Sequence, residues 1–132
     1  MDIKGAVFDM DGTLIDSLGV WEIIWEDLGL EFGYGKGFRP SVEDDKAIRT
    51  MLLADGMEMI HKNYNLGKNG TEVHKAAVEI TEKFYREQVE LKDGVSEYLT
   101  YLKEKNIPMC IASATAPELI KFAAERCGLY NF

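Results

Sequence analysis

The apolar residues of this chain follow two patterns: short continuous runs, and positions spaced three and four apart. Residues 3–8 form a short apolar run that the sequence Asp-Met-Asp-Gly closes, which is typical of a buried parallel strand ending in a functional loop. A second apolar run opens at Pro108 and ends in the small hydroxyl-bearing residues Ser113 and Thr115. The pattern therefore predicts two strands, one near each end of the chain.

Helical spacing of the apolar residues predicts helices between and after the two strands. The expected helices cover about 17–28, 42–53, a shorter stretch after Gly56, a long stretch capped by Thr71, 95–105 and 117–127. Asp16 or Ser17 is the expected N-cap of the first helix, and Ser41 with Asp44 forms a capping box before the second. Asp55 and its neighbouring glycine are expected to break the helical pattern.

This order of elements predicts an α/β protein in which a helical segment is inserted between two strands of a parallel sheet. We expect residues 1–15 and 92–132 to form the α/β core and residues 16–91 to form the helical insertion. In open parallel sheets, the ligand lies outside the carboxyl ends of the strands. Both polar sequences that follow the strands are therefore candidate site segments.

Composition narrows the classes of function. The chain has 132 residues and a net charge of −8 without a long basic run, which argues against nucleic-acid or anionic-membrane partners. It has no apolar stretch of the ~20 residues that a membrane span needs, and its N-terminus does not resemble a signal peptide. A cytoplasmic location is the expectation. The two cysteines, Cys110 and Cys127, do not suggest a disulfide framework.

Two aspartates two positions apart at a strand end have a specific chemical use. A carboxylate such as Asp9 can attack phosphorus and form an aspartyl-phosphate, which splits one difficult transfer into two easier steps. Asp11 lies on the same side of an extended chain, where it could protonate a leaving oxygen and later activate water. Because like charges repel, a divalent cation is expected beside them, and Mg²⁺ suits carboxylates and phosphate substrates.

Neighbouring residues could bind the same phosphoryl group. Gly12 allows a tight turn whose amides can bind phosphate oxygens. Ser113 or Thr115 could donate a hydroxyl hydrogen bond, and the helix that begins at Pro117 would direct its N-terminal dipole toward the ligand. Structural alternatives stay open at this point, because D-x-D-G sequences are common in turns, and both hydroxyl residues are ordinary helix N-caps.

Two sequences resemble motifs of a known family. "VFDMDGTLIDS" resembles the first motif of the haloacid dehalogenase-like (HAD) superfamily, an apolar strand followed by D-x-D-G-T, and "IASAT" resembles its second motif. The helical insertion after the first motif is similar to the C1 cap of the β-phosphoglucomutase and phosphoglycolate phosphatase branch. The resemblance implies a HAD-like Rossmannoid core with an inserted α-helical cap.

The resemblance also implies roles for individual residues. Asp9 would be the nucleophile and a Mg²⁺ ligand, and Asp11 would be the general acid/base, with its backbone carbonyl also meeting the metal. Ser113 would bind the transferring phosphoryl group; the other implied phosphate-binding residues are Gly12, Thr13 and Ala114. Thr13 favours phosphatase over mutase chemistry, and the second aspartate argues against dehalogenation. The implied function is a Mg²⁺-dependent phosphatase of a small phosphorylated metabolite.

The chain departs from the family pattern beyond the second motif. Members continue to a motif lysine and a further acidic metal ligand, whereas this sequence ends at "GLYNF". Lys103 and Lys121 follow helical patterns and read as surface charges, and the acidic cluster 43–45 reads as a helix start. The resemblance therefore implies an incomplete core with low activity.

An incomplete parallel sheet would leave strand edges unpaired, and such edges associate readily. We therefore expect self-association through an exposed sheet edge. The alternative to the phosphatase is a catalytically silent HAD-derived fragment or protein-interaction module.

Overall fold

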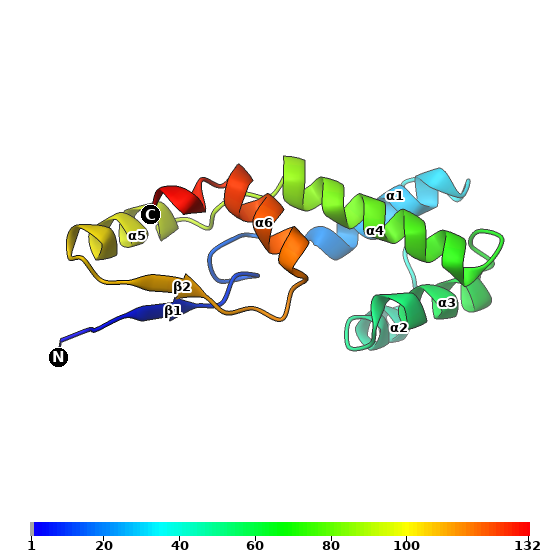
Figure 1. Ribbon diagram of the computed structural model, residues 1–132. Coiled ribbons are helices and arrows are strands. Elements are labelled where there is room, and N and C mark those ends of the chain that lie inside the picture. The colour runs from blue at the N-terminus through cyan, green and yellow to red at the C-terminus, as the bar shows by residue number, and fades with distance from the viewer. Residues whose placement is uncertain (1) are drawn as a thin grey trace. The chain divides into compact units, whose positions relative to one another are not determined.

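The computed structural model describes residues 2–132. Its elements, shown in Figure 1, are β1 (Ala6–Phe8), α1 (Val20–Glu31), α2 (Val42–Ile48), α3 (Leu53–Tyr64), α4 (Gly70–Glu87), α5 (Val95–Glu104), β2 (Met109–Ile111), α6 (Pro117–Arg126) and a short 3-10 helix (Leu129–Asn131). The predicted α/β class and the order of its two strands are confirmed. No helix among residues 2–132 is long and apolar enough to cross a membrane.

The chain forms two compact units. One, here called the sheet unit, holds the chain up to Gly19 together with Glu82–Phe132, and the other, the helical unit, holds Val20–Thr81. These limits differ from the expected boundaries at residues 15/16 and 91/92. The last six residues of α4 belong to the sheet unit, where Phe84 and Tyr85 are buried. The role of the helical unit as a cap stays a prediction.

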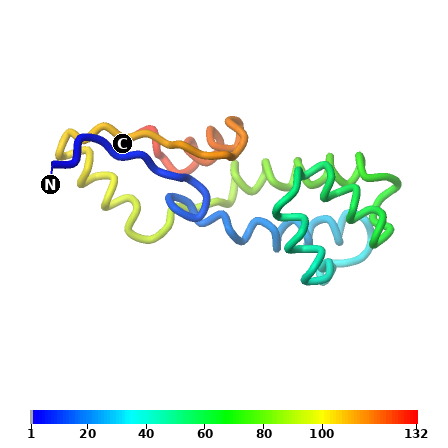
Figure 2. The backbone as a smooth tube through the Cα atoms, turned by 90° about the horizontal axis from the view of Figure 1, so that it is seen from below, coloured from blue at the N-terminus to red at the C-terminus, as the bar shows by residue number. Residues whose placement is uncertain are grey.

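The sheet unit is built on two short parallel strands. β1 and β2 lie side by side in Figures 1 and 2 and pair Ala6 with Met109 and Phe8 with Ile111. The ladder continues one step further, where the Ala112 amide donates to the Phe8 carbonyl at 2.8 Å. Because the strands are parallel and in this register, the segments that follow them leave the sheet at the same edge.

The helical unit has its own apolar core. Its buried residues come from all four of its helices and the turn before α4: Ile24, Trp25, Leu28, Ile48, Met57, Ile60, Leu66, Val73, Ala76 and Ala77. Trp25 is held at its polar end as well, since its Nε1 donates to Asp45 Oδ1 at 2.9 Å. A buried tryptophan usually needs such a partner for its N–H group.

The predicted helix break at Asp55 and Gly56 is wrong, because both residues lie inside α3. The helix expected over 42–53 instead ends at Ile48. A Cβ atom on Gly56 would lie 2.8 Å from Ile48 Cγ2, which is too close for a side chain. This glycine therefore permits α2 and α3 to pack closely, and it does not mark a turn.

The predicted cap at Ser41 is confirmed, since its Oγ accepts from the Asp44 amide at 3.1 Å. The reciprocal half of the capping box is replaced by Tyr64. The Tyr64 hydroxyl donates to the Asp44 carboxylate at 2.6 Å and accepts from the Ser41 amide at 2.8 Å. The start of α4 differs from the prediction, because Asn69, not Thr71, accepts a first-turn amide through its side chain.

Candidate functional site at the strand ends

The loop after β1 is a tight turn closed by its own backbone. The Met10 carbonyl accepts from the amides of Thr13, Leu14 and Ile15 at 3.2, 2.9 and 3.2 Å, and the Gly12 amide donates to the Ile15 carbonyl at 3.0 Å. Gly12 has a φ of 73°, a left-handed conformation that glycine adopts without strain. The apolar side chains of Met10, Leu14 and Ile15 are buried, and this burial anchors the loop in the sheet unit.

This turn corrects one expectation about phosphate binding. The amides of Gly12 and Thr13 already donate within the loop, so they are not the free donors that the sequence suggested. Within residues 2–132, the amides of Met10 and Asp11 meet no backbone or side-chain acceptor. The backbone amides available to a ligand are therefore those of Met10 and Asp11, directly after Asp9, and not those of Gly12 and Thr13.

Asp9 and Ser113 follow neighbouring strands. The pairing of Phe8 with Ile111 places Ser113 one residue beyond the position opposite Asp9. Asp9 is exposed, and its carboxylate has no hydrogen-bond partner in the part of the chain that the structure describes. Ser113 is half-buried, and its Oγ accepts from the Thr115 amide at 3.1 Å.

Asp11 has a different environment, since three hydroxyl groups donate to its carboxylate. Ser17 Oγ donates to Oδ1 at 2.6 Å, the Tyr85 hydroxyl donates to the same oxygen, and Thr115 Oγ1 donates to Oδ2. Ser17 and Tyr85 are almost fully buried, at 3% and 5% exposure. Burial, together with the nearby Asp11 carboxylate, raises the pKa of Tyr85 above its ordinary value, so this hydroxyl keeps its proton and remains a donor.

Sequence reasoning missed two of these donors. Ser17 is one of the two residues that the sequence predicts as the cap of the first helix, although α1 begins only at Val20. Tyr85 lies outside both sequence motifs. Its one signal in the sequence is its position next to the buried face of α4, since a tyrosine that becomes buried there needs a hydrogen-bond partner for its hydroxyl.

A lysine also lies against the loop. Lys92 Nζ donates to the Gly12 carbonyl at 3.1 Å, and the Lys92 amide donates to the Leu14 carbonyl at 3.0 Å. Lys103 and Lys121 make other contacts: Lys103 Nζ donates to the Asn131 carbonyl at 2.5 Å, and Lys121 lies 3.9 Å from Glu125 on α6. Lys92 is thus the lysine that contacts the loop in the described chain.

A metal ion at the strand ends would find few ligands among the described residues. Within residues 2–132, no cluster of three His, Cys, Asp or Glu side chains could enclose a metal ion. The Asp11 carboxylate accepts three hydroxyl hydrogen bonds, which leaves the open Asp9 carboxylate and the Asp11 carbonyl as hard oxygen donors. Mg²⁺ often binds through one or two carboxylates and retains several waters. The residues present therefore fit a partial Mg²⁺ site.

The acidic cluster in the helical unit has other contacts. Asp45 accepts from Trp25 and from Arg49, whose Nη2 lies 2.9 Å from Asp45 Oδ2. Burial alone would raise the pKa of Asp45, but the hydrogen bonds from Arg49 and Trp25 outweigh it and lower that pKa below its ordinary value. Asp45 thus remains ionised and stabilises its own unit.

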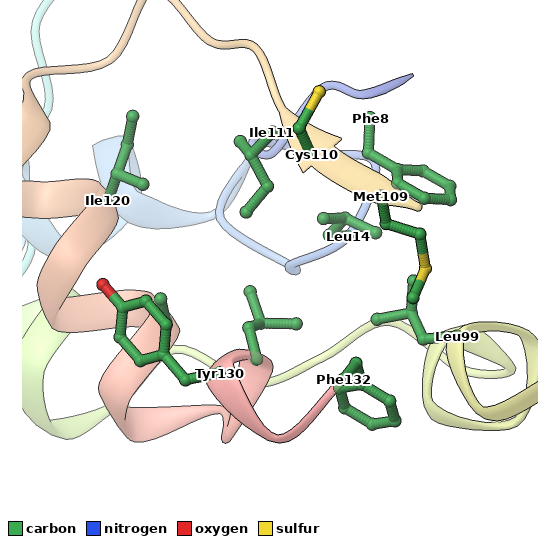
Figure 3. Close-up of a pocket in the computed structure, with 11 residues that line it drawn as sticks. Phe8, Leu14, Leu99, Met109, Cys110, Ile111, Ile120, Tyr130 and Phe132 are labelled. Carbon is green, nitrogen blue, oxygen red and sulfur yellow. The ribbon is translucent and has the colours of Figure 1, made fainter. Parts of the chain in front are cut away.

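A cavity of about 320 Å³ lies elsewhere in the sheet unit (Figure 3). Its lining is apolar and includes Phe8, Leu99, Met109, Ile120 and Phe132. None of the predicted site residues lines it. The polar chemistry at the strand ends and the apolar cavity are therefore separate features of the sheet unit.

Carboxylates and hydroxyls at the carboxyl ends of parallel strands define an α/β protein whose candidate site lies where this class binds its ligands. A family model for haloacid dehalogenase-like hydrolases matches residues 3–132. The chain belongs to this family, and the HAD-like fold class predicted from its motifs is confirmed.

Similar proteins include a hexitol phosphatase and a candidate beta-phosphoglucomutase. Hexitol phosphatase B of Escherichia coli (strain K12) is 27% identical over 119 residues, which cover 90% of this chain and 53% of that protein. A candidate beta-phosphoglucomutase from Thermotoga maritima has a TM-score of 0.79 at 21% identity, covering 97% of this chain and 57% of that chain.

A third similar structure contains a bound sugar phosphate. A mutant of CbbY from Rhodobacter sphaeroides, in complex with xylulose-(1,5)bisphosphate, has a TM-score of 0.66 at 16% identity, covering 96% of this chain and 58% of that chain. The two structural likenesses show the fold. The chain spans about half the length of the curated relatives it matches.

Proposed function

We propose that the chain contains the nucleophile and the general acid/base of a Mg²⁺-dependent phosphatase for small phosphorylated metabolites. The observation that supports this most directly is the contrast between two neighbouring aspartates. Asp9 is exposed and without a partner in the described residues, as an attacking group needs to be. Asp11 is fixed by three hydroxyls, as a proton-transfer group needs to be.

The proposed reaction has two steps. An Asp9 carboxylate oxygen attacks phosphorus while the bond between phosphorus and the ester oxygen breaks, and Asp11 gives its proton to the departing alcohol. Water then attacks the aspartyl-phosphate, Asp11 takes a proton from that water, and the bond between Asp9 and phosphorus breaks. The products are an alcohol and inorganic phosphate.

Backbone and hydroxyl donors near Asp9 could bind the phosphoryl oxygens. The amides of Met10 and Asp11 have no acceptor among residues 2–132, and the same holds for the Ala114 amide after β2. Ser113 Oγ accepts from the Thr115 amide and keeps its own proton free to donate. The proposed phosphate-binding group therefore consists of Ser113, Ala114 and the amides of Met10 and Asp11.

Mg²⁺ would be held by the Asp9 carboxylate and the Asp11 carbonyl, with water completing its coordination. When bound, it would supply positive charge that offsets repulsion between Asp9 and a phosphoryl group. The Lys92 ammonium lies against the same loop and adds a positive charge of the chain's own.

The substrate class follows from the relatives as a proposal. One relative's name refers to a hexitol phosphate, and one similar structure contains xylulose-(1,5)bisphosphate. Both are hydroxyl-rich carbon chains with phosphate esters. We propose a phosphorylated sugar or polyol as the substrate of the protein to which these residues belong, and a cytoplasmic location for it.

The test is phosphate release from an aryl phosphate by this chain across a Mg²⁺ titration, with Asp9→Asn measured in parallel. We expect Mg²⁺-dependent release that the substitution abolishes. Beryllium fluoride, which mimics a phosphoryl group on aspartate, should raise the melting temperature of the wild type in the presence of Mg²⁺ and leave Asp9→Asn unchanged. Equal release by the two proteins would overturn the proposal.

A second candidate function is an interaction module, favoured by the sheet itself. Each of the two strands has one hydrogen-bonded neighbour in the described chain, and Val7 on β1 is 69% exposed. A free strand edge offers amides and carbonyls that an identical edge can pair with, so the proposed occupant is a second copy of this chain. Sedimentation velocity over a concentration series should then show dimers that Val7→Lys removes. A monomer at all concentrations would exclude this candidate.

A further inference from the structure

The two oxygens of the Asp11 carboxylate are not equivalent. Oδ1 accepts two hydrogen bonds, from Ser17 and from Tyr85, whereas Oδ2 accepts one, from Thr115. A carboxylate oxygen has two lone pairs in its plane, so both are used on Oδ1 and one remains open on Oδ2. Only Oδ2 can take up a proton without losing a hydrogen bond from a buried group.

We infer that Ser17 and Tyr85 are positioning residues that hold Oδ1 of Asp11, and that Oδ2 is the atom that exchanges protons with substrate and water. This inference rests on the proposed phosphatase function and assigns the proton transfer to one atom of the same site. It gives Tyr85, a residue outside both sequence motifs, a defined part in the reaction.

The three hydroxyl donors to Asp11 differ in exposure, as expected if Oδ1 is held in place and Oδ2 exchanges protons. Ser17 and Tyr85 are 3% and 5% exposed, so water cannot readily replace either one at Oδ1. Thr115 is half-buried, and its hydroxyl can act as donor or acceptor. It donates to one lone pair of Oδ2, and the second lone pair of that oxygen stays open to take up or give the proton. The three hydroxyl contacts to Asp11 are therefore kept in both protonation states.

Contacts around Tyr85 fix it relative to the second motif. The next residue along α4, Arg86, has its guanidinium 4.3 Å from the centre of the Phe122 ring on α6. Beyond α4, the Val89 carbonyl accepts from Arg126 Nε at 2.7 Å, and Arg126 also contacts Glu90 at 2.5 Å. The end of α4 is thus attached at two places to α6, the helix that follows Thr115. Such attachment holds a side chain in one geometry, as positioning requires.

The proton path is then specific to one atom. In the first step, the proton on Oδ2 passes to the ester oxygen as the bond from that oxygen to phosphorus breaks. In the second step, Oδ2 takes a proton from the water whose oxygen attacks phosphorus. Through both steps Oδ1 keeps its hydrogen bonds from Ser17 and Tyr85, so the carboxylate does not rotate.

The test is a double-mutant cycle in this chain that combines Tyr85→Phe with Asp11→Asn, measured by aryl phosphate hydrolysis with Mg²⁺. Tyr85→Phe removes only the hydroxyl and should lower kcat about tenfold with KM unchanged. In the Asp11→Asn background it should have no further effect, because the group it positions is no longer a proton donor. Ser17→Ala should behave in the same way and serves if Tyr85→Phe fails to fold.

Two controls separate positioning from general loss of structure. Tyr101→Phe removes a hydroxyl that is without a hydrogen-bond partner in the described residues and should leave kcat unchanged; the Tyr101 side chain lies against Tyr98. Thermal stabilisation by Mg²⁺ and beryllium fluoride, which reports on Asp9, should be the same in the wild type and in Tyr85→Phe.

The outcomes are distinct. Wild-type turnover that Tyr85→Phe and Ser17→Ala leave unchanged, or that they reduce equally with and without Asp11→Asn, would overturn the positioning role and leave the proposed function intact. A wild type with no turnover and no stabilisation by beryllium fluoride would overturn the proposed function, and the inference would fail with it.

Discussion

The helical unit and the sheet unit bury their apolar residues in different places. The helical unit surrounds Trp25, Leu28 and Ile60 with other helices, and all three are at most 1% exposed. In the sheet unit, strand residue Val7 is 69% exposed, whereas Met10 in the candidate loop is fully buried. The helical unit thus uses burial to stabilise a helical core, whereas the sheet unit also uses it to fix the loop that carries the polar site.

The largest expected effect separates chemistry from stability in the sheet unit. Asp9→Asn should lower turnover at least about 10³-fold, because an amide cannot serve as the attacking carboxylate. It should leave the free energy of unfolding nearly unchanged, since Asp9 is exposed and has no hydrogen-bond partner in the described residues. Steady-state kinetics and urea denaturation of the same samples measure the two quantities. A comparable loss in both would show that Asp9 is structural.

The next effect is expected in the helical unit. Leu28→Ala removes a fully buried side chain from the helical core and should lower the free energy of unfolding of this unit by about 2–5 kcal/mol. Both tryptophans of the chain, Trp21 and Trp25, lie in α1, so tryptophan fluorescence reports the unfolding of this unit selectively. A change below about 1 kcal/mol would mean that the core repacks around the shortened side chain.

The helical unit also shows how far periodicity alone predicts structure. The apolar spacing of Leu18, Trp21, Ile24, Trp25 and Leu28 predicts one amphipathic helix, because a stripe repeated every three or four residues must face a core. Ile24, Trp25 and Leu28 are buried on α1 as this pattern predicts, whereas Leu18 lies before the helix and is exposed. It failed at Gly56, because a glycine in a turn and a glycine at a close helix contact look alike in sequence. Only the position of Ile48 on α2, which is a tertiary contact, distinguishes them.

In the sheet unit, the motifs predicted the fold and the family but not all of the site. Asp9, Asp11 and either Ser113 or Thr115 were predicted because they follow apolar strands closely, and the family resemblance selected Ser113. The structure places these residues after neighbouring strands. Tyr85 could not be predicted to reach Asp11, since the contact joins residues 74 positions apart in the chain. Whether these residues act as assigned remains a prediction.

A smaller effect tests the charged contact in the helical unit. Asp45→Asn removes the negative charge that pairs with Arg49 and should cost about 1 kcal/mol of stability at pH 7, since the pair is partly exposed. Tryptophan fluorescence during urea denaturation measures this cost. Lys62→Gln, at an i,i+4 pair with Glu58 in α3 whose side chains are 68% and 47% exposed, should leave stability unchanged and is the matched control in the same unit.

The Asp45 contribution should depend on pH in one direction. The pKa of Asp45 in the folded chain lies below its ordinary value of 3.8 because the bonds from Arg49 and Trp25 outweigh the effect of burial. The contribution is therefore fully present above about pH 4 and is lost as the pH falls through the lower folded pKa. The stability difference between wild type and Asp45→Asn should shrink in acid. A difference that grows below about pH 4 would contradict the assigned contact.

The smallest effect is expected at Val7, the exposed counterpart of the buried residues in the helical unit. Val7→Ala should change stability by less than about 0.5 kcal/mol, since the side chain is 69% exposed and loses little burial. Hydrogen exchange of the Ala112 amide, which donates to Phe8 across the two strands, measures stability at this sheet. A loss of about 2 kcal/mol or more would mean that Val7 is covered in solution. If that loss then diminished on dilution, the cover would be a second copy of the chain, because only an association among identical chains weakens as their concentration falls.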